Sequence, residues 1–149
     1  MPTRTPLALV IELAVKSRDA IARQAATAEK LVIDARTQLD ALHRYHGDYL
    51  ARSARRPEHD TATLRNFNAF IQRLEMAIVQ QRTTMEHHET RTAVLKAEYT
   101  RAAIKVKSLE TLAATRQAEA RRAADRAERK LEDEHASRAA HHARTPIAR

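Results

Sequence analysis

A repeat of apolar side chains, spaced alternately four and three residues apart, is the feature that most constrains this chain. From Leu7 it selects thirteen positions, eleven of them apolar: Leu7, Ile11, Ala14, Arg18, Ile21, Ala25, Ala28, Val32, Ala35, Leu39, Leu42, His46 and Tyr49. A second run of eighteen positions, fourteen apolar, contains Phe67, Ile71, Leu74, Ile78, Gln81, Met85, His88, Thr92, Leu95, Tyr99, Ala102, Val106, Leu109, Ala113, Arg116, Ala120, Ala123 and Ala127. Because this spacing keeps the side chains on one helix face, it predicts coiled coil rather than disorder.

The two runs are separated by Pro57, the one proline in the chain interior. Proline lacks a backbone donor and disfavours helix in the residue before it, and the surrounding residues 52–60 carry no apolar period. Thr5 followed by Pro6 suits a helix start, and Asp60 or Thr61 offers a capping oxygen for a second helix. We therefore predict an all-α fold, with residues 1–149 forming a single antiparallel coiled-coil hairpin. Its parts are a helix at about 5–52, a turn at about 53–60 and a longer C-terminal helix at about 61–141.

The composition argues against a globular enzyme. Leu, Ile, Val and Phe supply only 28 of the 149 residues, whereas alanine supplies 30, and there is no Trp and one Gly. Large side chains provide most of the buried area in a core, so the seam between the helices should be thin. A glycine-rich phosphate loop is excluded, and two straight helices offer no enclosed pocket. We expect no catalytic residue, no cofactor, no metal and no small-molecule substrate; the pairs His43/His46, His87/His88 and His141/His142 are interpreted as surface histidines.

Two further expectations follow from placing the turn at Pro57. Counting outward from it sets Gln81, His88 and Thr92 opposite the region Ile21 to Val32, as polar markers of register. The second helix also outlasts the first, so the segment from Leu109 to about His142 keeps an alanine stripe but has no intramolecular partner.

The charge of the chain and its lack of targeting signals limit which kinds of partner it can have. There is no Cys, no apolar run near the roughly 20 residues that span a bilayer, and no cleavage site after the apolar stretch Leu7–Val15. The net charge of +8 permits nucleic acid, anionic membrane or an acidic protein surface. In the basic segment 116–130, anions are interspersed with cations and no aromatic is present for base stacking. A solvated face or a protein-docking face is therefore favoured over phosphate binding, and a basic coiled-coil nucleic-acid binder and a generic coiled-coil scaffold stay as alternatives.

The stripe around Phe70 is wider than a two-helix seam requires. Phe70 and Ala77 lie beside the seam positions, which leaves two interpretations open. Phe70 either stays exposed as a docking surface or packs against the first helix near Tyr45 or Tyr49.

The run Asn66-Phe67-Asn68-Ala69-Phe70-Ile71-Gln72-Arg73-Leu74-Glu75-Met76-Ala77-Ile78-Val79-Gln80-Gln81 resembles the central signature of FliJ, a flagellar type III export family. Leu42-His43-Arg44-Tyr45-His46-Gly47-Asp48-Tyr49 matches its Leu-x-x-Tyr-x-x-acid-Tyr segment, and Leu109-Glu110-Thr111-Leu112 and Asp133-Glu134-His135-Ala136 match later landmarks. The resemblance covers nearly the whole chain. It departs at His135, where an apolar residue is common, and near His88, where an aromatic is usual.

The resemblance implies a non-enzymatic component of flagellar protein export, similar to the coiled-coil stalk of the rotary ATP synthase gamma subunit. The implied partners are the hexameric export ATPase, the cytoplasmic domain of the membrane export gate, and export chaperones. The gate-binding residues would be Phe70, Leu74, Ala77 and Gln81, and the location would be the cytoplasm, peripherally on the inner membrane. An injectisome stalk, which shares the hairpin, is the alternative.

Overall fold

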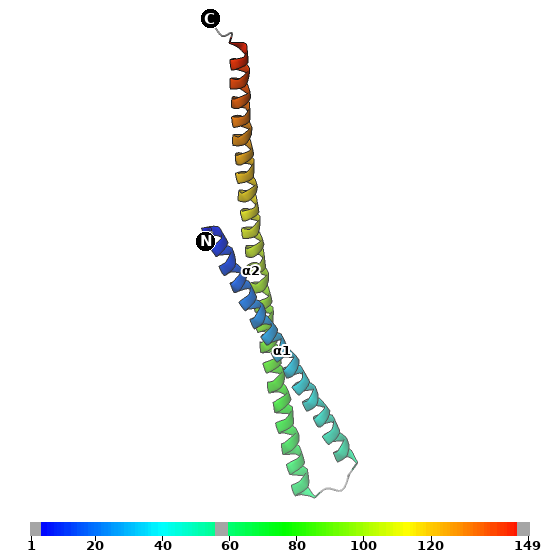
Figure 1. Cartoon of the computed structure of the whole chain (residues 1–149). Helices are drawn as coiled ribbons and strands as arrows, with labels where there is room; N and C mark the ends of the chain where they lie inside the picture. The colour runs from blue at the N-terminus through cyan, green and yellow to red at the C-terminus, as the bar shows by residue number, and fades with distance from the viewer. Residues whose placement is uncertain (1–3, 56–59, 146–149) are drawn as a thin grey trace. The chain divides into compact units, whose positions relative to one another are not determined.

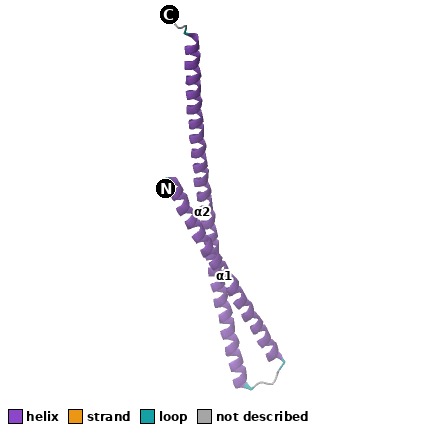
Figure 2. Cartoon of the chain, viewed as in Figure 1, coloured by secondary structure: helices purple, strands orange, loops and turns teal. Residues whose placement is uncertain are grey.

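Two long helices account for almost all of the described chain. The computed structural model describes residues 4–55 and 60–145, and in these ranges it contains α1, Pro6–Ala54, and α2, Thr61–Arg144, with no strand. The helices contain 49 and 84 residues (Figure 1), and short loop segments flank them (Figure 2). The expectation of an all-helical chain with two long helices is confirmed. Neither helix holds a stretch apolar enough to cross a membrane, over the residues described.

Local capping explains where each helix begins. The Oγ1 atom of Thr5 accepts a hydrogen bond from the backbone N–H of Ala8 at 3.2 Å, just before Pro6 starts α1. Asp60 does the same for α2, because its Oδ1 atom accepts the N–H of Thr63 at 2.7 Å. Such bonds satisfy N–H groups that have no partner in the first helical turn. α1 runs slightly past its predicted end near 52 and α2 slightly past its predicted end near 141; Pro57 itself lies outside the described residues.

Contacts divide the chain into two units. One contains Val15–Ala103, and the other joins the residues up to Ala14 with those from Ile104 onward. In the Val15–Ala103 unit, the interactions that connect α1 with α2 include Tyr49 with Phe67, His46 with Glu75, Arg36 with Glu89, and Glu29 with Lys96. Residue numbers fall along α1 as they rise along α2, so the paired segments run antiparallel. The Arg36–Glu89 and Glu29–Lys96 pairs, each 3.3 Å, are exposed and add little stability.

The interior of this unit is a narrow seam of small and aliphatic side chains. Its buried residues all fall on the predicted heptad positions, namely Ala25, Ala28, Ala35, Leu39, Leu74, Ile78, Thr92 and Leu95. Ala25, Ala28 and Leu95 form one core cluster. The hydroxyl of Thr92 is satisfied within its own helix, by donating to the carbonyl of His88 at 2.8 Å. Tyr99 departs from the pattern, because it is exposed although the heptad places it on the seam.

The predicted register was wrong for Gln81. Its Nε2 atom donates to the carbonyl of Ala35 at 3.1 Å and to Oε1 of Gln38 at 3.0 Å, so it does not face the region Ile21 to Val32. The prediction paired residues at equal distances before and after Pro57, and it took no account of the side chains that determine which residues of the two helices lie opposite each other. Contacts of Tyr49 with Phe67 and Phe70 bring the α1 end against a later part of α2 than that count assumes.

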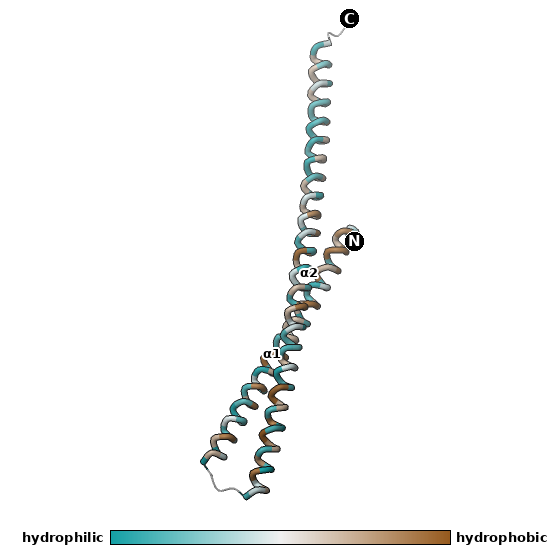
Figure 3. The backbone as a smooth tube through the Cα atoms, turned by 180° about the vertical axis from the view of Figure 1, so that it is seen from behind, coloured by the Kyte–Doolittle hydropathy of each residue, from teal (hydrophilic) through white to brown (hydrophobic). Residues whose placement is uncertain are grey.

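The other unit contains the start of α1 and the C-terminal part of α2. Val106 is its most buried side chain, at 2% exposed, and Leu7 and Ile11 are half-buried. Every residue from Ala114 to Thr145 is exposed, and this stretch of α2 is mostly hydrophilic (Figure 3). The alanine stripe expected here therefore lies at the surface.

The thin seam makes a first prediction about stability. Leu95 is 5% exposed in the core cluster, so Leu95→Ala removes packed methyl groups where little else fills the space. We expect the free energy of unfolding to fall by about 2–4 kcal/mol, measured by urea unfolding followed by circular dichroism. The neighbouring Val94→Ala serves as control, because Val94 is exposed and should cost under about 0.5 kcal/mol. Equal losses for the two variants would contradict the assigned seam.

Candidate functional site

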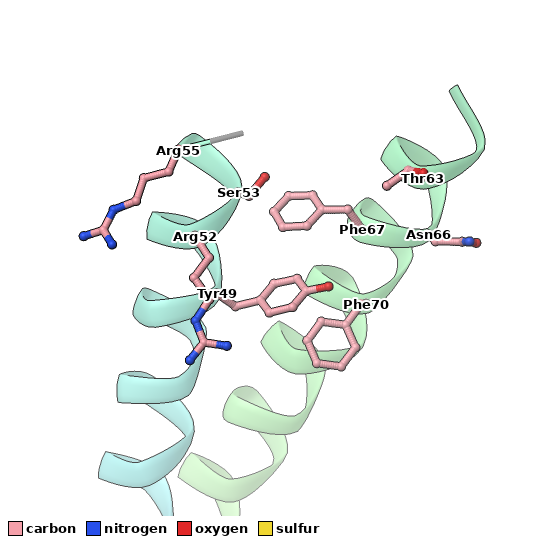
Figure 4. Close-up of a pocket in the computed structure, with 8 residues that line it drawn as sticks. All are labelled: Tyr49, Arg52, Ser53, Arg55, Thr63, Asn66, Phe67 and Phe70. Carbon is pink, nitrogen blue, oxygen red and sulfur yellow. The ribbon is translucent and has the colours of Figure 1, made fainter. Parts of the chain in front are cut away.

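Four of the five aromatic residues gather between the C-terminal end of α1 and the first turns of α2. The rings of Tyr49 and Phe67 are stacked, with centroids 5.1 Å apart. Phe70 lies 4.5 Å from Tyr49 and meets Tyr45 edge-on at 6.1 Å. We call these four residues the aromatic cluster; Figure 4 shows Tyr49, Phe67 and Phe70 lying between the two helices. Such ring pairs stabilise beyond the area that they bury, so the cluster holds this end of the unit together.

The four residues expected to bind a partner form one ridge on α2, at spacings of four, three and four. Leu74 is buried in the seam, whereas Phe70, Ala77 and Gln81 are half-buried. Of the two interpretations left open for Phe70, packing against Tyr45 and Tyr49 is the one observed. The ridge thus flanks the seam rather than standing free in solvent, and only the outer edges of its side chains are accessible.

Residues of α1 adjoin this ridge, and of these sequence analysis named only Tyr45, as a possible contact of Phe70. A hollow of about 590 Å³ is lined by Gln38, Ala41, Leu42 and Tyr45 of α1 together with Gln81. No charged side chain lines it among the described residues, and two of its lining residues, Gln38 and Gln81, are hydrogen-bonded to each other. A partner bound along the ridge would therefore contact both helices. Only the cross-helix register could have identified Gln38, Ala41 and Leu42 as neighbours of the ridge.

A second apolar patch lies away from the seam. Met76 and Val79 are 71% and 62% exposed, and with Gln72, Glu75 and Gln80 they line a hollow of about 530 Å³. Met76 and Val79 are three residues apart and lie outside the heptad positions, so two apolar residues on the outward face of the helix could have indicated this patch. Sequence analysis did not use that signal.

The histidines do not converge on a metal site. Over residues 4–55 and 60–145, no group of three or more His, Cys, Asp or Glu side chains is placed to hold a metal ion. His46 instead lies 3.4 Å from the carboxylate of Glu75 across the two helices. The rings of His87 and His88 are 6.0 Å apart on consecutive residues.

The comparisons with known proteins identify the family. The family model described as "Flagellar FliJ protein" matches residues 3–145. The chain belongs to the FliJ family. This membership makes it a component of the flagellar protein-export apparatus, in a family that is non-catalytic. No curated protein and no solved structure matches the chain.

The position of Phe70 predicts its effect on stability. Because this FliJ-family chain packs Phe70 against two tyrosines, Phe70→Ala should lower the free energy of unfolding by about 1–3 kcal/mol. Met76→Ala, on the outward face of the same helix, should change it by less than about 0.5 kcal/mol. Thermal unfolding followed at the helix band of circular dichroism measures both. A Phe70→Ala protein as stable as wild type would show that the ring is not packed as described.

Proposed function

We propose that this chain is a stalk and assembly factor for the flagellar export ATPase and that it links the ATPase to the export gate. The observation that carries the proposal is the family match over residues 3–145. That match is to a flagellar protein, which favours the flagellar system over an injectisome. In this proposal the protein also escorts export chaperones and works on the cytoplasmic face of the inner membrane.

An antiparallel coiled-coil hairpin over the whole chain, with a longer C-terminal helix, is the architecture proposed for the stalk. The antiparallel pairing within Val15–Ala103 supports it. The exposed residues Ala114–Thr145 supply a surface that a ring of ATPase subunits could enclose. Alanines on this face permit close approach of another protein, and the arginines between them suit an acidic lining.

The ridge of Phe70, Leu74, Ala77 and Gln81 is proposed to contact the gate. Its half-buried members leave an apolar edge beside the uncharged hollow near Tyr45. Aromatic side chains held in place by neighbours are typical binding hot spots, because little conformational entropy is lost when they are covered. The intramolecular contacts of Phe70 therefore preorganise it for a partner.

The stalk role predicts an effect on ATPase assembly. Stoichiometric wild-type protein should raise the hexamer fraction of the export ATPase in sedimentation velocity. The double variant Ala120→Glu, Ala127→Glu should reduce this effect about tenfold, because it puts carboxylates on the alanine stripe that the ring would cover. Ala118→Glu with Ala136→Glu, on the opposite face, is the matched control. An ATPase that assembles equally with all three proteins, or without any of them, rules out the stalk role.

The gate contact predicts a second, separate loss. Phe70→Ala should weaken binding to the gate cytoplasmic domain about tenfold in a titration by calorimetry. Leu95→Ala is the control for stability, because it loosens the same two helices without altering the ridge. Met76→Ala controls for the outward face. If Leu95→Ala weakens binding as much as Phe70→Ala, the ridge is not the contact surface.

A further inference from the structure

A pocket of about 650 Å³ opens beside the aromatic cluster, at the end of the Val15–Ala103 unit where α1 stops. Tyr49, Phe67 and Phe70 form its floor, and the remaining lining side chains are Arg52, Ser53, Arg55, Thr63 and Asn66. In Figure 4 the three rings lie between the helices, Ser53 points toward Phe67 and Arg52 lies beside Tyr49. Arg55 and Asn66 are drawn extending away from the rings, from α1 and α2 respectively. The pocket thus combines an apolar floor with a polar edge.

The pocket exists because large rings separate the helices here. Figure 1 shows α1 and α2 diverging toward this end of the unit, whereas alanines line the seam at Ala25, Ala28 and Ala35. Helices that meet through alanine approach closely, and helices that meet through tyrosine and phenylalanine cannot. The wider spacing leaves ring edges uncovered.

The edge of the pocket carries positive charge, and several of its donors have no partner among the residues that the structure describes. Arg52 and Arg55 are exposed, and neither forms an ion pair with a residue that the structure describes. The side chains of Ser53, Thr63 and Asn66 likewise make no hydrogen bond within the described ranges. None of the lining residues that the structure describes is acidic. Two guanidinium groups favour carboxylates, which they bind with paired hydrogen bonds.

We propose that this pocket binds an acidic peptide segment of another protein, one in which a large aliphatic side chain adjoins carboxylates. The aliphatic group would rest on the ring edges of Tyr49 and Phe67, and the carboxylates would pair with Arg52 and Arg55. The site does not depend on the proposed role in export, since its own charges and shape carry it.

A nucleotide is another anion with an apolar part, and the geometry disfavours it. The faces of Tyr49 and Phe67 are stacked on each other, so no flat slot receives a base between them. The backbone N–H groups of Thr63 and Leu64 are already bonded to Asp60, which reduces the number of donors that the α2 N-terminus could offer to a phosphate. A branched aliphatic side chain needs neither feature.

Fluorescence anisotropy with a dye-labelled peptide, one leucine flanked on each side by two aspartates, tests the proposal on the full chain. Wild type should bind it, and the double variant Arg52→Gln, Arg55→Gln should bind about tenfold more weakly. Replacing the leucine by glycine should weaken binding by a similar factor. The double variant Arg82→Gln, Arg101→Gln removes the same charge from exposed positions of this unit outside the pocket and should bind within about twofold of wild type.

Three results would overturn the proposal. They are no binding of the peptide, equal weakening by the two arginine double variants, and competition by ADP at lower concentration than by unlabelled peptide. Circular dichroism of each variant verifies that helix content is unchanged, and glutamine preserves it because it is a good helix former. Phe67→Leu supplies a second test of the floor, because it retains an apolar side chain but removes the ring edge. It should weaken peptide binding although Arg52 and Arg55 are still present to pair with the carboxylates.

Discussion

Close packing of small side chains between two helices is the constraint on which the Val15–Ala103 unit depends. Alanine brings the helix backbones together but buries little area, so each layer contributes little and many layers are needed. Leucine and isoleucine at Leu39, Leu74, Ile78 and Leu95 supply most of the apolar volume among the buried residues. This explains why the unit uses long helices: its stability accumulates along the seam because no wide core is available.

The aromatic cluster lies at one end of this seam, where large rings replace the small side chains found along the rest of it. Ring contacts replace alanine contacts, the helices diverge, and two features appear together. One is the ridge from Phe70 to Gln81, which flanks the seam beside residues of α1. The other is the pocket edged by Arg52 and Arg55. Both suit binding of another macromolecule. Both exist because large side chains are concentrated at this end, whereas small side chains line the rest of the seam.

Sequence analysis predicted the helices because their signals are local. Asp60, one of the two capping residues considered, caps α2, and α1 starts at Pro6 after Thr5 as expected; the heptad positions coincide with every described buried residue of the Val15–Ala103 unit. The candidate site was predicted only in part. The residues Phe70, Leu74, Ala77 and Gln81 came from a family resemblance, and their contacts with Tyr45, Tyr49 and Gln38 did not. Those contacts join residues far apart in the chain, and a periodic pattern on one helix carries no information about its offset from the other.

The sequence by itself determined that this chain is helical, where each helix begins and which face of it is apolar, because turns, caps and a heptad period act over a few residues. Only the tertiary structure decided the register that pairs Gln81 with Ala35 and Gln38, the packing of Phe70 on two tyrosines, and the opening of the pocket. Alanine layers are nearly interchangeable, so several offsets would satisfy the same heptads. The bulky aromatic rings are not interchangeable, and their contacts select one offset.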